Sequence, residues 1–289
     1  MRETRTLLAA ALALAASTGI ARAADWSDTW LGYRYGTGYY MPGGKGADMA
    51  EKKTRLNTVS LSHASGYKYG SNFFNVDFLM SDSNDPSGGT GSDGAQEIYA
   101  VYRHTLSLSK VSGDKIAFGP VRDVGITAGF NMGSKNNQIG ARPRVLVLGP
   151  TLSFDVPGFF DVGLYASRET NHNGILCLPP NCSGNKVSFD TAYMLSAAWG
   201  IPLGPGSFKG FLTQTGKKGK DGFAAETGTE TLLEAAYMLD LGALGVGPKG
   251  TWHAGVGYQY WKNKYGVVSD AFTTSKTTRT PQLQLEAHF

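Results

Sequence analysis

His63 and Ser65 are the two residues whose types and spacing most resemble a catalytic arrangement. In an extended strand, residues two positions apart share a face, so the imidazole could act as a base for the hydroxyl nucleophile. The sequence offers no third residue that would orient the histidine. The pair therefore keeps an enzymatic interpretation open, beside the simpler one of a histidine at the end of a strand.

Two other segments resemble ligand-binding motifs, but neither has the complete motif. The glycine-rich segment 210–217 has one residue too many between its glycines to form a phosphate-binding P-loop. Cys177 and Cys182 enclose a short polar segment, and in an exported protein we expect a local disulfide there. A metal site would need more ligands, and only His172 lies nearby in the sequence. We therefore expect no cofactor and no bound metal.

Ionisable and aromatic residues also recur at alternate positions, where they would share the inward face of a strand. The residues that we expect to line such a face are Arg34, Phe73, Asp77, Glu97, Tyr99, Arg103, Tyr165, Asp190, Glu230 and Glu234. A lining with both charge signs favours uncharged polar solutes, and aromatic planes add stacking surface for flat rings or sugars. The alternative is that these side chains pair with one another and fill the interior.

The elements that must position these residues are strands, because polarity alternates with a period of two. Leu283 and Leu285 share one face of the segment 281–289, and Gln282 and Gln284 share the other. Similar alternation predicts twelve strands near 28–37, 53–63, 74–80, 96–107, 124–132, 143–155, 158–169, 186–199, 206–215, 230–241, 252–260 and 280–289.

The connections between these segments alternate between long and short. The odd connections are long and rich in Gly, Ser, Asn, Asp and Lys, whereas the even ones are mostly shorter and carry Pro-Gly or Gly-Pro signals. A soluble sandwich has no reason to alternate in this way. The pattern predicts an all-β fold, a 12-stranded antiparallel transmembrane β-barrel of the bacterial outer-membrane type, over residues 24–289.

The outward faces carry aromatic and basic residues at their ends. We expect aromatic girdles at both ends of the barrel, with Phe189 in the outer one. Five basic residues point outward at the outer strand ends, namely Arg55, Arg144, Arg168, Lys262 and Arg279. We expect them to form a collar that binds the phosphates of lipopolysaccharide, or else to extend toward water without a specific ligand.

Residues 1–23 read as a secretory signal peptide, with a charged start, a short apolar run and a small-x-small cleavage pattern. Its removal takes three arginines and one glutamate from a chain of formal charge +4, so the mature protein is nearly neutral. That balance argues against a nucleic-acid polymer as a partner. The terminal Phe289 matches the aromatic signal that the barrel-assembly machinery recognises in outer-membrane proteins.

The chain resembles the nucleoside-specific channel family of outer-membrane proteins, the Tsx-like family. The residues that carry the resemblance are 26–36, 73–78, 106–109, 118–123, 149–155, 161–166 and the terminal Phe289. The resemblance implies a monomeric twelve-stranded barrel with a narrow pore. It also implies passive passage of nucleosides and deoxynucleosides through sites of aromatic and ionisable residues.

From these observations we expect a non-enzymatic channel in the outer membrane of a Gram-negative bacterium, in contact with lipid and lipopolysaccharide. It would pass small polar solutes, of which nucleosides are the best single expectation. Two alternatives remain open. One is a lipid-modifying barrel enzyme that uses His63 and Ser65, and the other is a plugged barrel with a binding or adhesion role at its loops.

Overall fold

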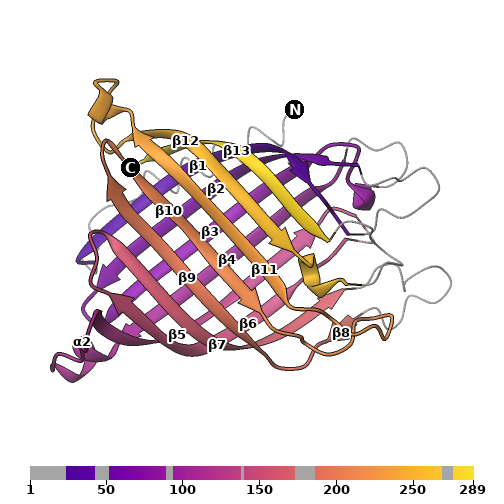
Figure 1. The fold of residues 1–289 in the computed structure, drawn as a ribbon, viewed down its shortest axis with the longest axis horizontal. Coiled ribbons are helices and arrows are strands. Elements are labelled where there is room, and N and C mark those ends of the chain that lie inside the picture. The colour runs from indigo at the N-terminus through magenta and orange to yellow at the C-terminus, as the bar shows by residue number, and fades with distance from the viewer. Residues whose placement is uncertain (1–23, 43–51, 89–93, 138–139, 173–185, 269–275) are drawn as a thin grey trace.

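A single antiparallel sheet dominates the computed structural model, which describes residues 24–42, 52–88, 94–137, 140–172, 186–268 and 276–289 (Figure 1). Its long strands are β1 Trp26–Tyr39, β2 Thr54–Tyr67, β3 Gly70–Ser81, β4 Gln96–Ser107, β5 Val121–Lys135, β6 Arg144–Phe154, β7 Phe159–His172, β9 Ala192–Leu203, β10 Gly206–Thr215, β11 Glu230–Asp240, β12 Trp252–Lys262 and β13 Thr277–His288.

The sheet closes on itself. Consecutive long strands pair as hairpins, and β1 also pairs with β13, so that the barrel has no free edge among its long strands. The sheet contains thirteen strands, of which β8 (Lys186–Ser188) has three residues and pairs with the end of β7. The remaining twelve form the barrel, which confirms the predicted strand number and antiparallel topology. A closed barrel satisfies every ladder hydrogen bond without water.

The two faces of each strand differ in the way the alternation predicts. In β13, Leu283 points away from the barrel and is 60% exposed, whereas Gln282 points inward and is 3% exposed. Leu146, Leu164 and Val256 show the same outward exposure in other strands. An apolar exterior around a polar interior is the arrangement that lipid requires, because hydrocarbon solvates the leucines and the lumen holds the amides.

Short and long connections lie at opposite ends of the barrel (Figure 1). At the turn end are the two-residue connections 68–69 and 204–205, the helix α2 (Leu108–Ser112) and the 3₁₀ turn η3 (Gly242–Leu244). At the loop end are η1 (Pro86–Gly88), η4 (Lys264–Gly266) and β8. In outer-membrane barrels the short turns face the periplasm and the long loops face outward.

Helix α2 has local reasons to begin and end where it does. The Ser107 side chain accepts a hydrogen bond from the Lys110 amide at its start, and Gly113 adopts the left-handed conformation at its end. Among the described residues, no helix combines the length and the hydrophobicity needed to cross a membrane.

The structure corrects the prediction of one continuous strand over 186–199. The chain forms β8, leaves the ladder at residues 189–191, and then forms β9, which pairs with β7 along most of its length. Phe189 lies in this break, buried under the ammonium of Lys218 at 4.4 Å from its ring centroid, and not in the outer aromatic girdle. The predicted signal peptide, Cys177 and Cys182 lie outside the described residues.

Candidate functional site: the lumen of the barrel

A charged group near mid-depth joins strands that are not neighbours in the sheet. Arg34 in β1 lies 2.5 Å from the Asp77 carboxylate in β3 and 3.2 Å from the Glu234 carboxylate in β11. We call these three residues the central bridge. The side chains of Arg34, Asp77 and Glu234 are 20%, 15% and 10% exposed, so water reaches Arg34 and Asp77 while Glu234 is buried. Since one guanidinium serves two carboxylates, the group carries a net negative charge.

Amide side chains hold the central bridge in place. Glu234 accepts hydrogen bonds from Gln259 at 2.8 Å and from Gln282 at 3.3 Å. Asp77 accepts one from Asn75 at 3.0 Å. Because each carboxylate already has partners besides Arg34, the charges are fixed in position before any solute arrives.

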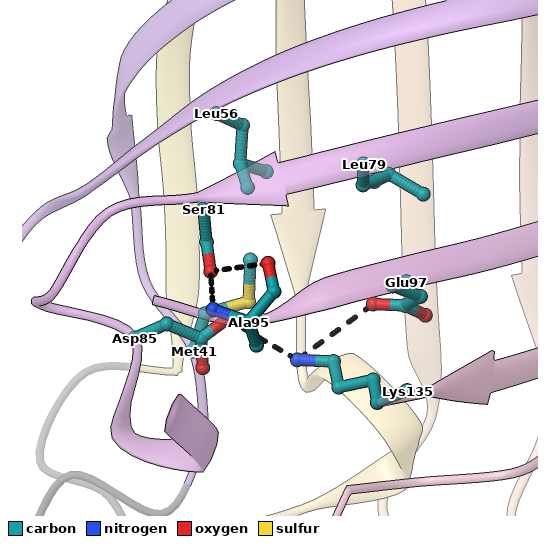
Figure 2. A pocket seen from close by; sticks show the side chains of 8 residues that line it. All are labelled: Met41, Leu56, Leu79, Ser81, Asp85, Ala95, Glu97 and Lys135. Carbon is teal, nitrogen blue, oxygen red and sulfur yellow. Dashed lines mark hydrogen bonds and ion pairs between the residues drawn. The ribbon is translucent and has the colours of Figure 1, made fainter. Parts of the chain in front are cut away.

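At the loop end, Lys135 is clamped between two carboxylates (Figure 2). Its ammonium lies 3.3 Å from Asp85 and 3.7 Å from Glu97, and the Lys135 side chain is only 6% exposed. Burial alone would raise the pKa of Asp85, but Lys135 and hydrogen bonds from Ser87 lower it below its ordinary value. Together with Met41, Leu56, Leu79, Ser81 and Ala95, these side chains line a hollow that is too small to hold a water molecule.

Lys264 enters the interior from η4, where the chain follows β12. Its ammonium lies 4.2 Å from the centroid of the Trp261 ring, 5.2 Å from that of Tyr265 and 3.2 Å from the sulfur of Met41. Burial lowers the pKa of Lys264 to about 8, against the opposing attraction of nearby carboxylates. Glu230 ties this turn to β11, because it accepts hydrogen bonds from the Trp261 ring and the Tyr265 amide.

A third lysine, Lys218, comes from the connection between β10 and β11. It lies 2.5 Å from Glu169 near the end of β7 and is almost fully buried. We call Lys135, Lys218 and Lys264 the loop-end lysines. All three are buried, and each contacts carboxylates, aromatic rings or both. The loop end of the lumen is therefore packed with charged side chains that have their partners within the protein.

One wall of the lumen is a chain of hydroxyl groups. Thr105, Thr127, Thr151 and Tyr165 are linked in that order at 2.8, 2.6 and 3.0 Å across β4 to β7. The ring of Tyr165 lies where a side chain at Gly163 would collide with it, so the missing side chain makes room for the phenol. Thr127, Thr151 and Tyr165 are buried and bonded to one another, so these hydrogen bonds fix the side chains of the wall in place.

The predicted lining residues lie at lumen-facing positions of the strands, with the exception of Asp190. Arg103 donates to the backbone carbonyls of Tyr102 and Phe130. Phe73 lies opposite Arg103 in the β3–β4 register. Asp190 lies in the break between β8 and β9 and is exposed, because the strand that was expected to carry it is interrupted there.

Several lumen residues were not among those predicted. Lys135 continues the alternation of the predicted segment 124–132, so a longer strand would have found it. Lys209 and Glu286 lie in predicted strands with the inward parity, and their spacing could have revealed them. Lys218 and Lys264 lie in connections, where alternation gives no signal.

The five collar residues lie on the outer surface at the loop end, and all are exposed. Arg279 lies over the Tyr260 ring at 5.9 Å from its centroid, and Arg144 donates to backbone carbonyls of Gly133 and Pro143. His63 lies at the turn end, where its Nδ1 is 2.8 Å from the hydroxyl of Thr29.

Closure, apolar exterior and the separation of turns from loops define an outer-membrane β-barrel, and they place the protein in the outer membrane of a Gram-negative bacterium. No model of a known protein family matches the chain, and no curated protein matches it.

The solved structures that are similar to this chain include three outer-membrane barrels. The translocator domain of the autotransporter NalP from Neisseria meningitidis has a TM-score of 0.45 at 12% identity, covering 100% of this chain and 97% of that chain. The COG4313 outer membrane channel from Pseudomonas putida F1 has a TM-score of 0.44 at 12% identity, covering 94% of this chain and 100% of that chain. The KdgM porin in complex with disordered oligogalacturonate has a TM-score of 0.43 at 11% identity, covering 90% of this chain and 99% of that chain. Values of this size do not assign the chain to any of these families.

Proposed function

We propose that the protein is a passive outer-membrane channel for small polar solutes and that nucleosides are its preferred solute class. The central bridge is the observation that carries this proposal. It places fixed charges of both signs at mid-depth in a closed barrel, and water still reaches Arg34 and Asp77. A solute that enters the lumen would meet these charges at mid-depth.

The nucleoside preference rests on the Tsx-like resemblance and on the aromatic side chains near the polar groups. Phe73 is 37% exposed at a lumen-facing position, opposite Arg103 in the register. A flat base could stack on an aromatic face at about 1–3 kcal/mol per ring, by analogy with single-stranded nucleic acids. The ribose hydroxyls would then bond to carboxylates and amides.

Conductance across planar lipid bilayers tests both levels of the proposal. The full-length mature protein is expected to form ohmic channels whose conductance falls when adenosine is added. Ribose, which lacks the flat ring, serves as the matched control and is expected to block less. Equal block by adenosine and ribose would remove the nucleoside preference, and an electrically silent barrel would remove the channel.

The role of the central bridge is tested by D77N/E234Q, which removes two negative charges and keeps Arg34. The reversal potential in a KCl gradient is expected to shift toward anion preference. The control is D25N/D114N, which removes two exposed carboxylates at the turn end. An unchanged reversal potential in D77N/E234Q would show that ions do not pass the bridge.

A second candidate function is a barrel closed at its loop end that binds a ligand or surface through its loops. The loop-end lysines favour it, because Lys135 and Lys218 form buried ion pairs at that end of the lumen. The bilayer measurement separates the two candidates. A barrel that stays silent in the wild type but conducts after the Asp85 contact is removed by D85N would be closed by these pairs.

We also propose that the collar of five basic side chains binds lipopolysaccharide phosphates. Exposed guanidinium groups at the outer membrane interface suit phosphate oxygens. Reversing all five charges is expected to abolish co-purification of lipopolysaccharide.

The protein is further proposed to act as a monomer and to engage the barrel-assembly machinery through Phe289, whose side chain is exposed. Deleting Phe289 is expected to slow assembly in cells.

A further inference from the structure

Three metal-binding side chains converge in the lumen at the turn end. His253 in β12 is the direct register partner of Glu286 in β13, and His288 lies two residues further along β13 on the same face. One ligand atom from each residue lies within 4.8 Å of those of the other two. Because two adjacent strands carry the three residues at fixed register positions, the ladder itself brings the donor atoms together.

The distance between two of the ligand atoms suits a metal with histidine and carboxylate ligands. His288 Nε2 lies 3.3 Å from Glu286 Oε2, and two ligands on one tetrahedral zinc ion are about 3.3 Å apart when the bonds are about 2.0–2.1 Å. The rings of His253 and His288 lie 4.6 Å apart, edge to face. In the part of the chain that the structure describes, the buried Nδ1 of His253 has no hydrogen-bond partner.

An orienting carboxylate lies behind one of the ligands. Asp28 in β1 lies 2.9 and 3.0 Å from Nδ1 of His288, which leaves Nε2 directed at Glu286. The Trp30 ring stacks on the same imidazole at 5.3 Å. A carboxylate that holds the far nitrogen of a histidine ligand is the usual support of protein zinc sites.

Lys209 supplies the competing positive charge. Its ammonium contacts both oxygens of Glu286, at 2.6 and 2.5 Å, and the side chain is 27% exposed. A divalent cation at the three ligands would repel this ammonium, which can turn toward the water of the lumen. Metal binding and the Lys209 ion pair are therefore alternatives at the same carboxylate.

We propose that His253, Glu286 and His288 bind one late first-row divalent cation, with Asp28 positioning His288. Two imidazoles and one carboxylate suit Zn²⁺, Ni²⁺ or Cu²⁺, whereas Ca²⁺ and Mg²⁺ prefer oxygen ligands alone. The ion joins β12 to β13 and, through Asp28, reaches β1. The ion would therefore stabilise the junction of β1 and β13. This role does not depend on which solute the lumen passes.

Zn²⁺ titration of the full-length, chelator-stripped barrel in detergent tests the site by calorimetry. The wild type is expected to bind one Zn²⁺ per barrel. H253A and E286Q are expected to lose binding, and D28N to weaken it about 10- to 100-fold. K209M is expected to bind Zn²⁺ more tightly, because the competing ammonium is gone. Because K209M keeps all three proposed ligands, its gain in affinity tests the site independently of the variants that remove a ligand.

The matched control is H63A, which removes a turn-end histidine whose ring already bonds to Thr29. It is expected to bind Zn²⁺ as the wild type does. Heat-modifiable mobility on gels establishes that each variant forms the barrel, and Zn²⁺ is expected to raise the thermal stability of wild type but not of H253A. Zn²⁺ binding that H253A leaves intact, or that K209M leaves unchanged, would overturn the proposal.

Discussion

The central bridge and the loop-end lysines use the same chemistry in different surroundings. In the bridge and at Lys135, a cation lies between two carboxylates contributed by separate parts of the chain. Arg34 in the bridge is 20% exposed, whereas Lys135 at the loop end is 6% exposed and its partner Asp85 is 2% exposed. The bridge is open to water at Arg34 and Asp77, whereas Lys135 and Asp85 are enclosed as in the interior of a folded protein.

This difference separates function from stability. A charge that water reaches can be met by a solute, and removing its partner leaves a group that water can solvate again. A buried charge that loses its partner has no such compensation, so the whole structure loses free energy. Changes at the loop end should therefore weaken the fold, and changes at the bridge should alter what passes.

The largest expected effect is that of K135M, which leaves Asp85 and Glu97 buried without their shared cation. The free energy of unfolding should fall by about 3–5 kcal/mol, measured by urea titration in detergent. The matched control is K110M, since Lys110 pairs with Asp25 at 3.5 Å in an exposed position. There the expected loss is below about 1 kcal/mol. Equal losses in the two variants would erase the distinction.

The pH dependence of stability sharpens the same point at Lys264. Burial holds its pKa at about 8 in the fold, against 10.5 as its ordinary value, so the unfolded chain keeps more protons between these limits. Stability should therefore rise with pH from about 8 to 10.5, by at most about 3.5 kcal/mol at about 1.4 kcal/mol per unit. K264M should lack this rise. An equal rise of the unfolding free energy with pH in wild type and K264M would contradict this assignment to Lys264.

R34M in the central bridge is expected to lose less stability than K135M, about 1.5–3 kcal/mol for charged hydrogen bonds. Its main effect should be on selectivity, because the bridge then carries two unbalanced negative charges. The reversal potential in a KCl gradient should move toward cation preference, while K110M should leave it unchanged. A stability loss in R34M as large as that in K135M would show that the bridge is structural.

Alternation was sufficient to predict the barrel, because each strand separates lipid from lumen and the pattern of β13 repeats around the ring. β4 and β10 occupy the predicted ranges 96–107 and 206–215. Other strands extend further, as β2 does to Tyr67, because the tight turn begins only where the ladder ends. Alternation carries little information on where a hairpin turns.

The lumen was predictable residue by residue but not pair by pair. Parity places Arg34 and Glu234 inside, yet their contact depends on how the closed sheet brings β1 and β11 to face one another. Lys264 could not be found, because its entry into the interior depends on the turn that follows β12. Asp190 was misplaced for a related reason, since a strand break at residues 189–191 leaves no trace in polarity.

The pairing of β1 with β13 also bears on the order of folding. It joins the first and last strands of the barrel, so nearly the whole chain must be ordered before this ladder can form. Until then, both strands present open edges to any neighbouring chain. We therefore expect this junction to form in the slowest step of assembly and to be the place where interrupted folding leads to aggregation.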